Sequence, residues 1–224
     1  MSIIKQLEEI KSTIPQGVTL VAVSKTKPDE DLIQAYETGQ RIFGENKVQE
    51  LAGKYERLAK DIQWHMIGHL QSNKVKYIAP FVSLIHAVDS IKLLKEINKQ
   101  AKNNNRTIDC LLQLHIAEEE NKFGFSPNEI KTVVEEIKDK DWKNIRIVGL
   151  MGMATFTDDQ LQIRREFKTM KLEFDQLKAS LFKNQDDFTH ISMGMSGDYK
   201  MAIEEGSTMV RVGSSIFGAR NYPL

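Results

Sequence analysis

A lysine stands at the end of an apolar run near the amino terminus, where its amine could do covalent chemistry. In the segment "VAVSKTKP", Lys25 follows four strand-like residues, 20–23, and precedes Pro28 by three positions. An amine at the rim of a buried strand is partly desolvated, which favours the uncharged form that attacks aldehydes and ketones to give a Schiff base. The alternative is a lysine whose stem lies on apolar surface while its head reaches water. We expect Lys27 to be the solvated lysine of this segment.

Two segments rich in glycine and serine near the other end of the chain could bind a phosphate. The segment "SMGMSGDY" supplies Ser192 and Ser196, and "VRVGSSIF" supplies Gly213 and Ser214. Serine hydroxyls and the amides of glycine turns are donors for a dianion. Each segment could also be an ordinary glycine-containing turn. Together with Lys25 they favour a ligand that carries a carbonyl at one end and a phosphate at the other.

Arg211 is the third candidate because it interrupts an apolar strand between Val210 and Val212. Burying a guanidinium without a partner is costly, so the pattern predicts an acceptor inside the fold. A carboxylate would serve, and so would the ring nitrogen of a pyridine.

The elements that must position these residues alternate along the chain. Amphipathic segments at 2–12, 26–39, 89–105, 125–140 and 158–181 are typical of helices. Short apolar runs are typical of strands, and we expect eight of them, at residues 18–24, 41–44, 62–68, 83–88, 109–116, 145–151, 188–194 and 208–214. This alternation predicts a single-domain α/β fold, a (β/α)8 TIM barrel over residues 1–224 with an extra helix at the amino terminus. An open doubly wound sheet is the alternative, although no glycine-rich dinucleotide motif follows the first strand.

In a barrel, functional side chains gather at the carboxyl ends of the strands. The residues expected there are unusually polar: Ser24, Lys25, Glu45, Asn46, His65, His69, His86, His115, Met153, Thr155, Ser192, Ser196, Arg211 and Ser214.

Composition excludes several function classes. The chain has 224 residues, of which 31 are Lys or Arg and 31 are Asp or Glu, so no net charge would attract nucleic acid or an anionic membrane. No apolar stretch approaches the roughly 20 residues that span a bilayer. The lone Cys110 lies in an apolar run and reads as a core thiol. His65 and His69 straddle a strand end, a poor spacing for a shared metal, so we expect none. A cytoplasmic monomer is the expectation.

Read together, the motifs resemble those of a known family. They are "AVSKTKP", "FGENKVQEL", "WHMIGHLQSNK", "HAVDS", "FGF", "GLMGMAT" and "SMGMSGDYKMAIEEGSTMVRVGSSIFGAR", in this order, and they cover the chain from Val18 to Arg220. The chain is similar in these motifs to the pyridoxal 5′-phosphate (PLP) homeostasis proteins, single-domain relatives of the alanine racemase barrel.

The resemblance implies a cofactor and a role for each candidate residue. Lys25 would hold PLP as an internal aldimine, which is a Schiff base, and Arg211 would face the pyridine nitrogen. Asn46, His65 and Ile67 would lie beside the ring. The residues implied to hold the phosphate are Ser192, Ser196, Gly213 and Ser214; a threonine is commoner in the family at the last position, but both hydroxyls donate.

Two functions fit this resemblance. The first is a PLP carrier without catalysis of its own, which buffers the cofactor inside the cell and hands it to apo-enzymes. The alternative is a PLP-dependent amino-acid racemase, which needs an acid–base group on each face of the substrate α-carbon. The five tyrosines of the chain offer no obvious second group, since Tyr36, Tyr55 and Tyr77 fall in helix-like stretches, Tyr199 begins a helix, and Tyr222 is near the carboxyl end. The carrier is therefore favoured. A Schiff-base aldolase fits the lysine and the phosphate site, but not the motifs.

Overall fold

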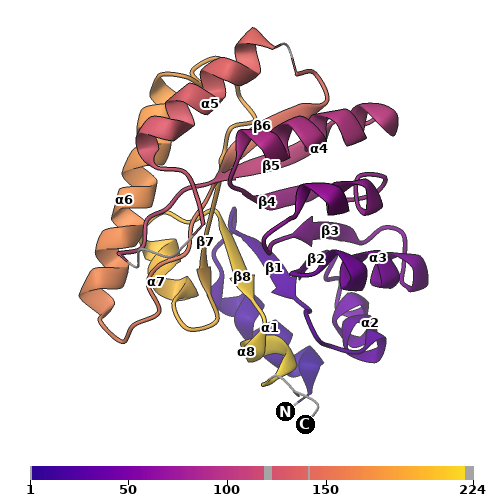
Figure 1. The fold of residues 1–224 in the computed structure, drawn as a ribbon. Coiled ribbons are helices and arrows are strands. Elements are labelled where there is room, and N and C mark those ends of the chain that lie inside the picture. Colours follow the sequence, from indigo (N-terminus) through magenta and orange to yellow (C-terminus); the bar gives the residue numbers. More distant parts are fainter. Residues whose placement is uncertain (1, 119–122, 141, 220–224) are drawn as a thin grey trace.

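Eight parallel strands form a closed barrel, as the sequence predicts (Figure 1). The structure is a computed structural model that describes residues 2–118, 123–140 and 142–219. Each strand pairs with the next, and β8 pairs with β1, so the sheet has no open edge and the doubly wound alternative is wrong. The strands are β1 (Thr19–Val23), β2 (Ile42–Glu45), β3 (Gln63–Met66), β4 (Leu84–Val88), β5 (Ile108–Gln113), β6 (Ile145–Met151), β7 (His190–Met195) and β8 (Met209–Val212).

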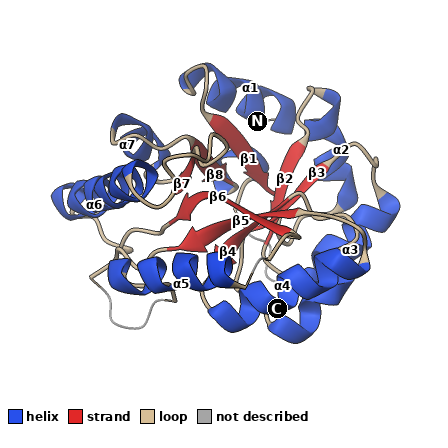
Figure 2. Ribbon diagram, turned by 90° about the horizontal axis from the view of Figure 1, so that it is seen from above, coloured by secondary structure: helices blue, strands red, loops and turns tan. Residues whose placement is uncertain are grey.

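Helices lie around the strands of the barrel, as the view from above shows (Figure 2). The extra helix expected at residues 2–12 is α1, which packs against α8 and α2. After β3 the crossover is a 3₁₀ helix, η1 (Ser72–Tyr77), instead of an α-helix. The α-helices are α1 (Ile3–Thr13), α2 (Asp29–Glu37), α3 (Val48–Arg57), α4 (Ile91–Asn103), α5 (Pro127–Asp139), α6 (Gln160–Ala179), α7 (Tyr199–Glu204) and α8 (Ser214–Phe217).

Local sequence signals explain where several helices begin. Ser126 and Glu129 form a capping box before α5: the Ser126 amide donates to the Glu129 carboxylate at 2.8 Å, and the Glu129 amide donates back to Ser126 Oγ at 3.4 Å. Before α4 the Ser90 side chain accepts from the Leu93 amide, and before α6 the Asp159 side chain accepts from the amides of Leu161 and Gln162. Pro28 immediately precedes α2 as its N-cap residue.

Two apolar clusters divide the core between the inside and the outside of the strands. Along β1, Leu20 and Ala22 join the large cluster between strands and helices, whereas Val21 points into the barrel. The interior cluster consists of Val21, Leu84, Ala87, Leu111, Val148, Met151 and Met209. Cys110 is fully buried in the outer layer, as predicted for a core thiol, and Trp64 is fully buried there as well. No helix among the described residues is long and apolar enough to cross a membrane.

Candidate functional site

The residues predicted to bind a ligand lie at the ends of β7, β8, β1, β2 and β3, which are consecutive around the barrel. The loops that follow these strands therefore form one continuous arc of the barrel mouth. In chain order the residues are Lys25 and Asn46, which follow β1 and β2; His65 in β3; Ser192 in β7 and Ser196 just after it; Arg211 in β8; and Gly213 and Ser214 after β8.

Close contacts join neighbouring loops of this arc. The Gly213 amide donates to Ser196 Oγ at 3.1 Å, which links the loops after β8 and β7. A Cβ atom at Gly213 would lie 3.0 Å from the carbonyl oxygen of Val23, so the loop after β8 also lies against the end of β1. A Cβ atom at Gly68 would lie only 2.6 Å from the carbonyl oxygen of Asn46. Glycine is required at Gly68 for the loops after β2 and β3 to approach this closely.

Lys25 is half-buried in a tight turn directly after β1. The Lys27 amide donates to the carbonyl of Ser24 at 3.1 Å and closes this turn. Thr26 has a φ of 62°, in the left-handed region that β-branched residues rarely adopt. β1 ends at Val23, so this turn follows the carboxyl end of the strand and lies at the mouth of the barrel.

Lys27 is not the solvated lysine that the sequence led us to expect. It is half-buried, and its ammonium group donates to the carbonyl oxygens of Phe217 at 2.6 Å and of Ala219 at 2.9 Å. Carbonyls at the end of α8 have no intrahelical donor, and a lysine is a suitable partner for them. Lys27 therefore joins the end of α8 to the β1 loop.

Arg211 lies inside the barrel and is 4% exposed. Its Nη1 donates to the carbonyl oxygen of Ser192 at 2.8 Å and to Ser192 Oγ at 2.6 Å, and its Nη2 donates to the carbonyl oxygen of Gly152 at 3.1 Å. Among the described residues no carboxylate is paired with it at ion-pair distance, although the more distant Asp198 favours its charge. Burial lowers the pKa of Arg211 to about 10, so it is a cation at neutral pH. Of the two partners considered for Arg211, the carboxylate is not found among these residues.

Two histidines extend this network across the barrel. His86 Nδ1 lies 2.9 Å from Ser192 Oγ, and His86 Nε2 lies 3.0 Å from His65 Nδ1. Strands β4 and β7 are not neighbours, so the first of these bonds must cross the interior. Burial lowers the pKa of His65 to about 3, and it lowers that of His86 as well, so both rings are neutral at pH 7. Arg211 can only donate, so the Ser192 hydroxyl proton is available to His86 Nδ1; in that tautomer of His86, Nε2 carries the proton and donates to His65 Nδ1.

Ser192 therefore lies in a different part of the site from the other residues predicted to hold phosphate. Its side chain is fully buried, and its oxygen is engaged by Arg211 and His86. Ser196, by contrast, is half-buried and Ser214 is exposed, both in the two loops that the Gly213 amide connects. The geometry separates an interior end, built around Arg211, from a rim built from these loops.

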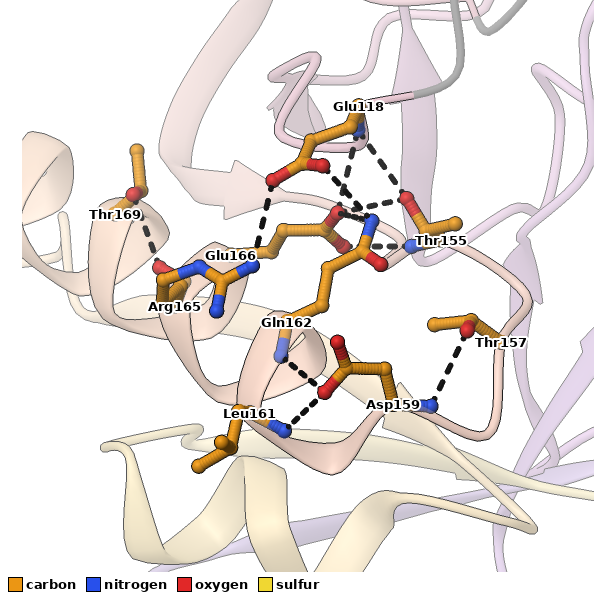
Figure 3. Close-up of polar contacts among 9 residues, drawn as sticks. All are labelled: Glu118, Thr155, Thr157, Asp159, Leu161, Gln162, Arg165, Glu166 and Thr169. Atoms are coloured by element: carbon orange, nitrogen blue, oxygen red, sulfur yellow. Dashed lines mark hydrogen bonds and ion pairs between the residues drawn. The ribbon is translucent and has the colours of Figure 1, made fainter.

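Another polar cluster fastens the loops on the opposite arc (Figure 3). Glu166 of α6 is 3% exposed, and its carboxylate accepts from the amide of Thr155 at 2.6 Å, from Thr155 Oγ1 at 2.7 Å and from the Glu118 amide at 3.2 Å. These bonds connect the loops after β5 and β6 to the helix. All the donors come from loop backbone or neighbouring side chains, so Glu166 is part of the scaffold.

No group of histidine, cysteine and acidic side chains in the described parts of the chain could hold a metal ion. His69, four residues from His65, instead pairs with Asp89 at 3.0 Å and stacks on Phe123.

The sequence did not single out Lys54 or a role for Glu45, yet both are buried beside the Lys25 turn. The spacing in the sequence could have indicated that Lys54 is buried, because it follows Val48 and Leu51 at every third position, and these three residues form the buried face of α3. A lysine in a charged helix normally reads as solvent-exposed, so this spacing is easily passed over.

Comparisons with known proteins place the chain in a family. Residues 2–221 match the family model described as alanine racemase, N-terminal domain. A pyridoxal phosphate homeostasis protein of Pasteurella multocida is 41% identical over 209 residues, which cover 92% of this chain and 88% of that protein. The protein of the same name from Homo sapiens is 40% identical over 212 residues, covering 91% of this chain and 77% of that one.

Solved structures agree with these sequence matches. PipY of Synechococcus elongatus, with PLP bound, is 32% identical with a TM-score of 0.86, over 96% of this chain and 100% of that chain. Its structure without PLP superposes with a TM-score of 0.90 at 33% identity and the same coverage. An alanine racemase of Clostridium difficile shares the fold at 15% identity and a TM-score of 0.76, and this chain spans 56% of it. The chain therefore belongs to the pyridoxal phosphate homeostasis protein family, whose barrel is that of the alanine racemase N-terminal domain.

Proposed function

We propose that this protein binds PLP through a Schiff base on Lys25 and serves as a carrier that releases the cofactor to apo-enzymes. The Lys25 amine would add to the aldehyde carbon of PLP, and water would leave as the carbon–nitrogen double bond forms. Pyridoxal phosphate appears in the names of the relatives and is bound in the PipY structure, which supports the assignment of this ligand.

The observation that carries the proposal is the buried Arg211. Its guanidinium has neutral oxygen partners and no paired carboxylate among the residues described, so an acceptor from a ligand would complete its surroundings. Arg211 also lies beside β1, opposite Val21, and Lys25 follows four residues later in that strand's direction. A ligand that spans an amine and a guanidinium in this geometry matches the aldehyde and the ring nitrogen of PLP.

The remaining residues fit the other parts of the cofactor. We assign the phosphate to Ser196, Gly213 and Ser214, since their two loops meet through the Gly213–Ser196 hydrogen bond. Ser192, which the family resemblance also implied for phosphate, we assign to holding Arg211, because both of its oxygens accept from that guanidinium.

The ring would lie between the loops after β2 and β3. Asn46 and Ile67 are half-buried there, and His65 ends the neutral histidine chain at this side. We assign Asn46, His65 and Ile67 to this wall. A guanidinium donates a hydrogen bond to the pyridine nitrogen but does not transfer its proton, so the nitrogen stays neutral. A PLP ring with a neutral nitrogen is a weaker electron sink.

We further propose that the protein does not racemise amino acids. Racemisation needs a second acid–base group, and the described tyrosines are engaged or lie elsewhere. Tyr36 bonds to Asp61, Tyr199 pairs with Thr13, and Tyr55 is stacked on Phe81. Tyr77 lies in η1, 52% exposed, and Tyr222 lies outside the described residues. One chain supplies all the assigned groups, which supports a monomer, and the cytoplasm is the compartment we propose.

Two assays test the carrier role. Loaded protein, separated from free PLP, should reactivate an apo-transaminase. Incubation with L-alanine in deuterated water, followed by chiral analysis, should show racemisation and α-hydrogen exchange that are slow or absent. Racemisation at about one turnover per second, an ordinary enzyme rate, would contradict the carrier role and show that the protein is a racemase.

A further inference from the structure

A buried ionic cluster lies behind the Lys25 turn, between the strands and α3. Lys54 of α3 is 2% exposed and Glu45 of β2 is fully buried. The Lys54 ammonium lies 2.8 Å from Glu45 Oε1 and 2.8 Å from Glu50 Oε1, so one cation bridges two carboxylates. The described residues contain other ion pairs, but this cation is far less exposed than those of the surface pairs, such as Arg41 at 37%.

The cluster holds both chain neighbours of Lys25. On one side, the carbonyl oxygen of Ser24 accepts from Lys54 Nζ at 2.8 Å, and Ser24 Oγ donates to Glu45 Oε1 at 2.5 Å. On the other side, the Thr26 amide donates to Glu50 Oε1 at 2.6 Å. The backbone before and after Lys25 is thus fixed to β2 and α3 by charge-assisted hydrogen bonds.

The bond to Thr26 has a particular task. A threonine at a φ of 62° is strained, by about 1–3 kcal/mol for a residue held in a sparsely populated region. Such a conformation persists only when its surroundings impose it. The Glu50 carboxylate binds the amide of this same residue, and Lys54 holds Glu50. The turn's shape therefore depends on Lys54 through Glu50.

Fold stability alone does not account for the cluster. Apolar residues of similar volume often stabilise a core as well as a buried ion pair does, because desolvating the two charges is costly. Glu45 Oε2 in addition has no hydrogen-bond partner among the described residues, which adds to the cost of burial. What the cluster supplies, and apolar residues would not, is directional bonds to Ser24 and Thr26.

We propose that Lys54 is a positioning residue for Lys25: through Glu45 and Glu50 it fixes the turn that aims the Lys25 amine at the aldehyde of the cofactor. This inference rests on the proposed Schiff base. Misplacing a reacting group by about 1 Å can cost on the order of 100-fold in rate, so a fixed turn has a direct chemical benefit.

A double-mutant cycle separates positioning from general packing. PLP affinity is measured by fluorescence titration for the wild type and for Lys54→Met, Lys25→Ala and the double variant. Because Lys54 is proposed to act through Lys25, Lys54→Met should weaken PLP binding about 10-fold when Lys25 is present and less than about 2-fold in the Lys25→Ala background. Equal losses in both backgrounds would overturn the proposal, since a packing defect acts with or without Lys25.

The rate of Schiff-base formation gives a second readout. Stopped-flow absorbance at the violet edge of the visible should show formation at least about 10-fold slower in Lys54→Met. Lys95→Met, which removes an exposed lysine of α4, is the matched control and should behave as wild type. An unchanged rate in Lys54→Met would contradict the inference. If the wild type itself forms no Schiff base, the proposed function fails instead.

A second variant keeps the test valid if Lys54→Met does not fold. Glu50 is 21% exposed in its side chain, so Glu50→Ala should fold, and it removes the acceptor of the Thr26 amide. It should slow Schiff-base formation about threefold while leaving noncovalent binding to the Lys25→Ala background unchanged. Wild-type rates in Glu50→Ala would contradict the proposal.

Discussion

Two buried polar networks lie on opposite sides of the strand wall, and they differ in how charge is balanced. Outside the strands, the Lys54 ammonium contacts the carboxylates of Glu45 and Glu50. Inside the barrel, the described residues that bond to Arg211 offer it neutral oxygens, and the network continues through neutral imidazoles. Within the described residues, the cation of the outer network is paired with carboxylates, whereas the cation of the inner network is not.

This difference assigns the two networks different tasks. A buried cation that is paired with carboxylates is costly to break and suited to fixing backbone, which is what the bonds of this cluster to Ser24 and Thr26 do. An unbalanced buried cation is suited to binding, since a ligand that offers an acceptor gains from the interaction. The account therefore predicts that changes in the outer network act mainly on stability and geometry, and that a change at Arg211 acts mainly on affinity.

The largest expected effect is on the stability of the apo-protein. Lys54→Met leaves two carboxylates without their buried cation and should lower the free energy of unfolding by about 3 kcal/mol. Arg211→Met leaves neutral acceptors behind and should cost about 1 kcal/mol. Urea unfolding of both apo-variants measures the contrast. A larger loss of unfolding free energy in Arg211→Met than in Lys54→Met would contradict the difference drawn between the two networks.

The next effect concerns which part of the cofactor each region binds. Ser196→Ala combined with Ser214→Ala should weaken PLP about 100-fold, because two hydrogen bonds to a dianion are lost, and should barely change pyridoxal, which has no phosphate. Arg211→Met should weaken both ligands alike, since both carry the ring nitrogen. If the serine variant lost affinity for PLP and for pyridoxal equally, the phosphate would have to bind at another part of the protein.

A pH dependence of stability should come from the outer network. Burial raises the pKa of Glu45 to about 7 from 4.5, although Lys54 and Ser24 act in the opposite direction. The folded state therefore keeps this proton at higher pH than the unfolded state does. The stabilising contribution is complete below pH 4.5 and is lost as the pH rises through about 7.

The free energy of unfolding of the wild type should accordingly fall by about 2 kcal/mol between roughly pH 5 and pH 8, and this fall should be absent in Glu45→Gln. Urea unfolding at several pH values measures it, and Glu30→Gln, a change at an exposed site, is the control. Parallel pH profiles for Glu45→Gln and the wild type would show that Glu45 titrates normally.

The smallest effect is expected at the far end of the inner network. His86→Phe keeps the ring volume but leaves Ser192 Oγ and His65 Nδ1 without one partner each, so stability should fall by about 1 kcal/mol. PLP affinity should fall only a few-fold, because Arg211 keeps its bonds to Ser192 and Gly152. An affinity loss equal to that of Arg211→Met would show instead that His86 is essential for holding the guanidinium.

The sequence predicted the barrel because strands and helices leave periodic signals. It singled out Lys25 and Arg211 as candidate ligand-binding residues because a charged residue beside or within an apolar run is conspicuous. It could not predict that Ser192 turns to Arg211, since its hydroxyl can serve a ligand or a neighbour equally well. Lys27 and Lys54 were missed for a related reason. Whether a helix or loop lysine is buried depends on acceptors far along the chain, such as Phe217 for Lys27.

The central claim is that Lys25 carries the cofactor, and borohydride reduction tests it most directly. Wild-type protein loaded with PLP should absorb at the violet edge of the visible, and reduction followed by peptide mapping should place the pyridoxyl group on Lys25. Lys25→Ala should lose the band, whereas Lys27→Ala, the nearest lysine variant, should keep it. A full band in Lys25→Ala, with the reduced adduct on another lysine, would contradict the account.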